Sequence, residues 1–314
     1  MYARGTRGAR SDYVSIYDAR SLLPVGEVAV PTRMGQSNVS YGYFERLGDR
    51  FLAIFNQFPQ VSVSIVDLDA RAFVGEIPIA GCASVYPLDE TRFATLCGDG
   101  TALEIRLDAS GRLAARAASE PFFDPVADPV AMPAGRDGQR LVFVSFAGQV
   151  HSVDFSGERP VAAPPWRLGG EKPDGAKRWR PGGLQHVAVL PAERRLYVVM
   201  HEGEPGSHKE PGPEIWVYDL DAHARVARYE PPNLTAAFLA GVTGVEPGSF
   251  VYRLLEWLVP SDGVHSIALS HDARPLLFAR NAERGALAVL DARTGATLRV
   301  VTDVGLAGPS LRVP

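Results

Sequence analysis

Short, largely apolar, strand-like runs recur along the chain, and each run closes on an aspartate followed by a turn. The runs are rich in β-branched and aromatic residues, which favour strands. Their closing aspartates are Asp18, Asp67, Asp108, Asp154, Asp219 and Asp291. These aspartates are spaced 49, 41, 46, 65 and 72 residues apart. A strand-rich period of about 40–50 residues is typical of β-propeller blades, so the pattern predicts an all-β propeller.

The pattern predicts five complete blades, each with a turn after every strand. They are expected at residues 40–79, 80–119, 125–168, 183–230 and 264–302. Two strands, 13–19 and 24–31, precede them, and PSLRVP (309–314) is a candidate strand that would join this pair in a mixed blade. A propeller removes its edge strands by closing its ring, so we expect residues 1–314 to form a single β-propeller domain with one partial blade.

One segment, residues 231–262, interrupts the period and is interpreted as an insertion. Val251, Leu254, Leu255 and Leu258 follow helical spacing, so an apolar helical stripe is predicted. Ser249 is a candidate helix cap and Pro260 a candidate helix end. Two interpretations stay open: a short helix packed on its own propeller, or a contact surface for a partner subunit or a membrane.

Composition narrows the class of protein. The formal net charge of −4 argues against nucleic-acid binding, which needs a basic face for the phosphates. The sequence has no run of about 20 apolar residues that would span a membrane. The start, MYARGTRGAR, is basic but lacks the apolar region of a signal peptide, which taken alone suggests the cytoplasm.

The two cysteines, Cys82 and Cys97, each lie at or near a predicted strand. Strands joined by the turn PLDE run antiparallel and bring the two sulfurs within reach of each other. The residues alone leave two alternatives, a disulfide in an oxidising compartment or two free buried thiols.

Few residues suggest chemistry. The seven histidines show neither HxH nor HExxH spacing, and there is no GxSxG elbow, no Walker loop and no repeated metal-ligand set of the kind a propeller hydrolase needs. The six aspartates fit structural turn positions, because a carboxylate accepts local backbone N–H groups. The basic stretch AKRWRPGGLQ, residues 176–185, is interpreted either as a surface loop or as a contact site for an acidic partner.

Several stretches resemble the heavy subunit of methylamine dehydrogenase and of its aromatic-amine relatives. WRPGGLQHVAVLPAERRLYVVM followed by SHKEPGPEIWVYDLDA is similar to a family segment with WRPGG, R-x-Y and H-K before a strand that closes on aspartate. YARGTRGARSDYVSIYDARSLLPVGEVAVP, VSIVDLDARAF and the last blade, SIALSHDARPLLFA to TGATLRVV, resemble further family stretches in the same order. The resemblance covers most of the chain from Tyr2 onward.

The resemblance implies a seven-bladed propeller in the bacterial periplasm that carries no catalytic residue, cofactor or metal of its own. It would hold a light subunit bearing tryptophan tryptophylquinone, which oxidises primary amines to aldehyde and ammonia and passes electrons to a small copper protein. It also implies a disulfide between Cys82 and Cys97. Candidate subunit contacts are Trp179, Arg180, Gln185 and Trp257.

Two departures from the family pattern bear on this expectation. The family's first blade and export signal have no counterpart before Tyr2, so we expect the chain to be truncated at its start. The 231–262 insertion is foreign to the pattern. The alternative hypothesis is a stand-alone propeller that binds partners or acts as a scaffold, without amine dehydrogenase activity.

Overall fold

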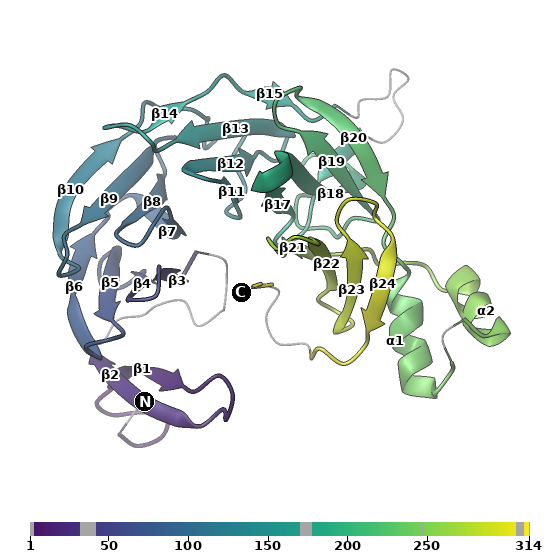
Figure 1. Cartoon of the computed structure of the whole chain (residues 1–314), viewed down its shortest axis with the longest axis horizontal. Helices are drawn as coiled ribbons and strands as arrows, with labels where there is room; N and C mark the ends of the chain where they lie inside the picture. The colour runs from purple at the N-terminus through teal and green to yellow at the C-terminus, as the bar shows by residue number, and fades with distance from the viewer. Residues whose placement is uncertain (1–2, 32–41, 170–177, 247, 306–310, 314) are drawn as a thin grey trace. The chain divides into compact units, whose positions relative to one another are not determined.

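The computed structural model describes residues 3–31, 42–169, 178–246, 248–305 and 311–313. The chain divides into two compact units, Met1–Phe122 with Phe155–Val161, and Phe123–Asp154 with Ala162–Pro314. Antiparallel sheets dominate both units (Figure 1). The expectation of a single domain over the whole chain stays a prediction.

The first sheets along the chain follow the predicted blades. A two-stranded sheet pairs β1 with β2, and two four-stranded sheets follow with their strands in chain order. The strands are β1 (Asp12–Tyr17), β2 (Pro24–Val30), β3 (Phe44–Leu47), β4 (Phe51–Asn56), β5 (Ser62–Asp67), β6 (Ala72–Pro78), β7 (Cys82–Pro87), β8 (Arg92–Cys97), β9 (Ala102–Leu107) and β10 (Leu113–Ala118). The leading strand pair and the first two complete blades are therefore confirmed.

Three further sheets match the other predicted blades. The first holds β11 (Gly135–Asp137), β12 (Arg140–Val144), β13 (Gln149–Asp154), β14 (Val161–Ala162) and β15 (Trp166–Arg167). The second holds β16 (Arg178–Pro181), β17 (Val187–Leu190), the 3-10 turn η1 (Pro191–Glu193), β18 (Arg195–Gly203), β19 (Glu214–Asp219) and β20 (Ala224–Tyr229). The third holds β21 (Ser266–Leu269), β22 (Leu276–Asn281), β23 (Ala286–Asp291) and β24 (Thr297–Val301). Successive four- and five-stranded antiparallel sheets are β-propeller blades, as the sequence predicted.

The described residues of the candidate C-terminal segment PSLRVP do not form the predicted strand. Residues 309, 310 and 314 lie outside the described residues, and Leu311, Arg312 and Val313 belong to no strand. Leu311 is held by a side chain instead of a sheet, as shown below.

The aspartates that close the repeated strands organise the turns that follow them. Asp219, for example, accepts the backbone N–H groups of Asp221 (2.8 Å) and Ala222 (2.9 Å), and these bonds together with Arg195 lower its pKa to about 2. Turn N–H groups are bound in the same way by Asp18, Asp67, Asp108 and Asp291. Asp154 binds the Arg140 side chain across β12 and β13. These contacts match the structural role that the sequence predicted.

The insertion contains two helices, α1 (Leu234–Thr243) and α2 (Phe250–Leu258). The predicted helix corresponds to α2, whose first turn is capped by Ser249 through the Tyr252 N–H and which ends before Pro260. The sequence analysis missed α1, although Asn233 caps its start and Gly244, at φ +72°, ends it. In Figure 1, α1 lies beside the last sheet, where it contacts β23, and α2 packs on α1.

The predicted apolar stripe of α2 is turned outward. Leu255 is half-buried, but Val251, Leu254 and Leu258 are exposed, and no residue of α2 is fully buried. The side that faces inward carries Tyr252, Leu255 and Val259. Of the two interpretations left open, packing within the chain holds for Leu255 alone, and a contact surface formed by the other three residues stays a prediction. None of the described helices has the length and apolar character needed to cross a membrane.

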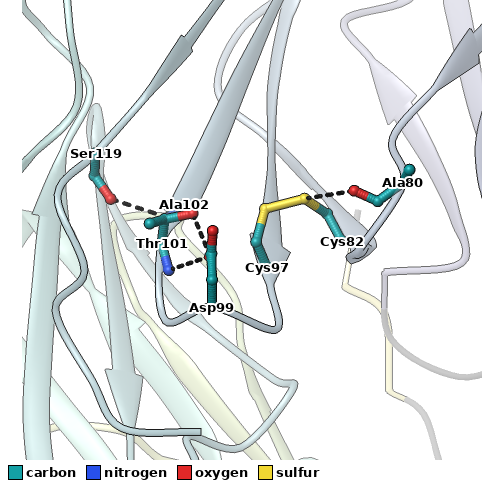
Figure 2. Close-up of a disulfide and its surroundings, with 7 residues drawn as sticks. All are labelled: Ala80, Cys82, Cys97, Asp99, Thr101, Ala102 and Ser119. Atoms are coloured by element: carbon teal, nitrogen blue, oxygen red, sulfur yellow. Dashed lines mark hydrogen bonds between the residues drawn. A yellow bond between two sulfur atoms is a disulfide. The ribbon is translucent and has the colours of Figure 1, made fainter.

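Cys82 and Cys97 lie opposite each other in register on β7 and β8, and a disulfide joins them (Figure 2). The backbone N–H of Cys82 donates to Ile79 and that of Cys97 to Thr101, so the two cysteines share no ladder hydrogen bond. Such pairs bring opposing side chains closest together in an antiparallel sheet. The structure therefore contains the bridge that the resemblance implied, and the alternative of two free thiols is wrong.

We expect reduction of this disulfide to lower the free energy of unfolding by about 3 kcal/mol. The bridge spans a sequence separation of 15 residues, and closing a loop of that length restricts the unfolded chain by roughly this amount. Denaturant unfolding with and without dithiothreitol measures the loss. A double variant, Cys82→Ala with Cys97→Ala, is the control and should not respond to reductant. An unchanged midpoint for the reduced native chain would contradict the prediction.

Candidate functional site

The WRPGG segment forms an interrupted strand at the edge of its sheet. Ala176 and Lys177 of the predicted basic stretch lie outside the described residues. From Arg178 onward, β16 pairs with the second half of β18, and β17 pairs with the first half. Between them, Gly182 and His186 still bond to Val199 of β18, but the backbone N–H groups of residues 183–185 donate to His208 and His265 instead. This break is the part of the segment where side chains and backbone are free to make other contacts.

The two glycines of the break lie so close to neighbouring atoms that neither position has room for a Cβ. A Cβ on Gly182 would lie 2.3 Å from Nδ1 of His201. Gly183 has φ +116°, and a Cβ there would lie 2.5 Å from the carbonyl oxygen of His265. Glycine is therefore needed here for close approach as well as for conformation.

Hydrogen bonds of the Gln185 side chain connect the break to two distant parts of the chain. Its side chain is buried, and Nε2 donates to the carbonyls of Ile267 (3.1 Å) and Leu311 (3.0 Å), while Oε1 accepts the Leu311 N–H (3.0 Å). Its backbone also forms a parallel bridge with Ser266 at the start of β21. Gln185 was a candidate subunit contact; its amide is occupied within the chain, and a contact with a partner stays a prediction.

Trp179 belongs to an aromatic and cationic cluster. Its ring lies 5.1 Å from that of Trp216, and the Arg228 guanidinium lies over both rings, at 5.4 Å and 5.2 Å. Cation–π contacts of this kind favour a fixed ring position. The side chain of Trp179 is half-buried, so part of the ring remains accessible.

The carboxylate of Glu214 accepts hydrogen bonds from two members of this cluster, Trp216 and Arg228. Its buried carboxylate accepts Nε1 of Trp216 (2.6 Å) and Nε of Arg228 (2.7 Å), and a further bond joins it to Nη2 of Arg228. Burial acts to raise the pKa of Glu214, but the bonds from Arg228 and Trp216 outweigh it and hold the pKa below its usual range. The carboxylate is therefore ionised at neutral pH.

Replacing Glu214 with glutamine should cost about 2 kcal/mol of unfolding free energy, because its three charge-assisted hydrogen bonds are weakened or lost. Thermal unfolding followed by tryptophan fluorescence measures this, since Trp216 reports on the site. Glu230→Gln is the matched control on the following loop and should leave stability within about 0.5 kcal/mol. Equal effects of the two variants would contradict the anchoring role.

A cavity of about 340 Å³ lies beside β16. Its lining includes Arg178, Trp179 and Arg180 of β16 and Arg167 at the end of β15. Two of the four predicted contact residues, Trp179 and Arg180, thus meet at one cavity. Trp257 is placed elsewhere, on α2, where its side chain is 80% exposed.

Several histidines are buried around the break. Burial lowers the pKa of His186 to about 4, an effect that the Gly183 backbone opposes and that His208 and His201 reinforce. Burial also lowers the pKa values of His201 and His265. Among the described residues, no group of three or more His, Cys, Asp or Glu side chains is arranged to hold a metal ion. The histidine spacing predicted no zinc site, and nothing in the sequence indicated that these rings lie around one break.

A sequence model of the family described as methylamine dehydrogenase heavy chain (MADH) matches residues 1–233, which is more than half of the chain. The chain belongs to the methylamine dehydrogenase heavy chain family. The family resemblance drawn from the sequence is thus confirmed. The family match ends one residue before α1, which begins at Leu234.

Individual heavy chains of the family match almost the whole sequence. The methylamine dehydrogenase heavy chain of Methylophilus methylotrophus is 24% identical over 330 residues, covering 99% of this chain and 69% of the relative. That of Paracoccus versutus is 27% identical over 327 residues, covering 99% of this chain and 66% of the relative. The chain therefore spans about two thirds of the length of these heavy chains.

A solved structure shares the fold. Dihydro-heme d1 dehydrogenase NirN in complex with DHE matches with a TM-score of 0.55 at 16% identity, over 93% of this chain and 52% of that chain. At this identity the likeness concerns the fold alone.

Proposed function

We propose that the chain acts as the heavy subunit of an amine dehydrogenase and that it holds a light subunit carrying tryptophan tryptophylquinone. The observation that carries the proposal is the match to named methylamine dehydrogenase heavy chains over 99% of the chain. In this assignment the quinone of the light subunit oxidises a primary amine to aldehyde and ammonia, and the electrons pass to a small copper protein.

The roles of the polar residues support placing the reactive group on the partner. The aspartates that close the repeated strands are engaged by turn N–H groups, as with Asp219 and Asp291. Glu214 and Gln185 are engaged by internal hydrogen bonds. We therefore assign no catalytic residue to this chain and expect it to supply shape and contacts.

We also propose a periplasmic location. The Cys82–Cys97 disulfide supports it, because disulfides form and persist in oxidising compartments. The family resemblance implies the same compartment.

Co-expression with a family light subunit tests the proposed function. The two chains should co-purify, the complex should show quinone absorbance, and it should reduce an electron-accepting dye only when a primary amine is present. The heavy chain alone should show neither property. The proposal would be contradicted if the heavy chain remained a colourless monomer when co-expressed with a correctly folded light subunit.

A stand-alone scaffold is the second candidate function, and one observation favours it. The helical insertion begins where the family match ends, and α2 exposes Phe250 (81%) and Trp257 (80%). Deleting residues 234–259 tests which of these partners the insertion serves. Loss of light-subunit binding would place the insertion in the dehydrogenase interface, whereas retained binding would leave it for another partner.

A further inference from the structure

We propose that the cavity beside β16 binds a carboxylate group attached to an apolar body. The proposal stands on the cavity itself and holds whichever of the two functions applies. The carboxylate can come from a free organic acid or from an acidic residue of a partner protein, and the experiment below distinguishes these sources.

All the charged side chains among the described lining residues are positive. Three arginines line it, Arg167, Arg178 and Arg180, and none of the described lining residues is acidic. This contrasts with the whole chain, whose formal net charge is −4. Like charges gathered around one concave space create a positive potential that attracts an anion.

Two of these guanidinium groups have hydrogen-bonding capacity to spare. Arg180 donates from Nε to the carbonyl of Gly203 (3.2 Å), which uses one of its five N–H groups. Arg178 is exposed, and no ion pair between it and a carboxylate is seen among the described residues. A guanidinium matches a carboxylate through two parallel hydrogen bonds, so both groups are suited to this ligand.

The rest of the wall is apolar and ordered. Leu168, Trp179 and Met200 line the space beside the arginines. The Trp179 ring contacts Trp216 and the Arg228 guanidinium, and these contacts favour a fixed position for its flat surface. A simple inorganic anion makes no use of such a surface, whereas an acid with an aromatic or branched body does.

The size of the cavity limits the ligand. At about 340 Å³ it lies at the small end of ligand pockets. It accommodates one aromatic or branched acid, or an acidic side chain with one apolar neighbour, but not a long chain. The ligand class is therefore a small apolar carboxylate or its equivalent on a protein surface.

Calorimetric titration of the full chain tests this with defined probes. Phenylacetate should bind at least tenfold more tightly than phenylacetamide, phenethylamine or inorganic phosphate. A capped Phe-Asp-Gly peptide should likewise bind more tightly than capped Phe-Asn-Gly. Binding of phenylacetate alone assigns the cavity to free acids, and preferential binding of the peptide assigns it to a partner protein; both support the proposal.

Variants tie the binding to the cavity. Arg178→Gln and Arg180→Gln should each weaken phenylacetate binding about fivefold or more. Arg299→Gln, a change of an exposed arginine on β24, is the matched control and should have no effect. Arg178→Glu should invert the preference toward phenethylamine, which a general loss of folding cannot do. Equal affinity for phenylacetate and phenylacetamide, or full binding by both glutamine variants, would overturn the proposal.

Discussion

Replacing Gly183 with alanine should lower the free energy of unfolding by about 4 kcal/mol. Two costs add at this position. A non-glycine residue at φ +116° carries backbone strain of about 1–3 kcal/mol, and an extra methyl group in a filled space costs a further 1–3 kcal/mol. The methyl group would meet the carbonyl oxygen of His265 at 2.5 Å, and backbone cannot move aside as a side chain can. Denaturant unfolding of the purified variant measures the loss.

Gly138→Ala separates the two costs. Gly138 also has positive φ, +63°, but a Cβ there would meet nothing within 4 Å. We therefore expect this control to lose only about 1–2 kcal/mol, the cost of the left-handed conformation. If both variants lose the same amount, the close approach of residue 183 to the backbone of His265 has no energetic weight.

Acidification from pH 6.5 to pH 4 should destabilise the chain through its buried histidines. The pKa of His186 is about 4 in the folded chain, below its ordinary value of 6.5, because burial disfavours the charged ring. Below pH 6.5 the unfolded chain binds a proton that the folded chain does not. The contribution of His186 to stability is therefore fully present above about pH 6.5 and falls as the pH decreases, by on the order of 3 kcal/mol at pH 4.

Other buried histidines act in the same direction. Burial lowers the pKa values of His201 and His265, although Glu210 opposes the effect at His201, and Glu283 and Asp262 oppose it at His265. Carboxylates with lowered pKa values, such as Asp219 at about 2, lose their contribution only at more acidic pH. The interval from pH 6.5 to 4.5 thus isolates the histidines.

Unfolding curves of His186→Leu across this interval are the measurement. Leucine has no titrating group, so the slope of stability against pH should decrease markedly. His271→Leu, a change of an exposed histidine after β21, should keep the full slope. A His186→Leu slope equal to that of the native chain would show that the buried ring does not control acid stability.

The blades could be predicted from the sequence because their signal is local. Runs such as Ser62–Asp67 and Ala286–Asp291 specify strands by their own residues, and the closing aspartate binds turn N–H groups only two or three residues further on. The helix α2 was equally accessible, since Ser249 and the apolar spacing lie within one segment. Its orientation was not, because the facing surface is supplied by α1, which the sequence analysis overlooked.

The site around the WRPGG break could be located but not interpreted from the sequence. The sequence analysis treated the two glycines only as part of a basic stretch, and the groups that approach them closely belong to His201 and His265. Gln185 was expected on a contact surface because the resemblance drew attention to it, whereas its hydrogen-bond partners are Ile267 and Leu311. Contacts across such separations depend on how the sheets pack, and no local pattern encodes them. Trp179 and Arg180 line the same cavity because they share one strand, and their contact with a partner subunit stays a prediction.

The link between Gln185 and Leu311 has a consequence for synthesis on the ribosome. The two residues are separated by 126 positions, and translation proceeds at about 5–20 residues per second. For roughly 6–25 s after Gln185 is added, the emerging polypeptide cannot satisfy this amide with its final partner. The Gln185 amide can therefore reach its final set of partners only after the last sheet has been synthesised.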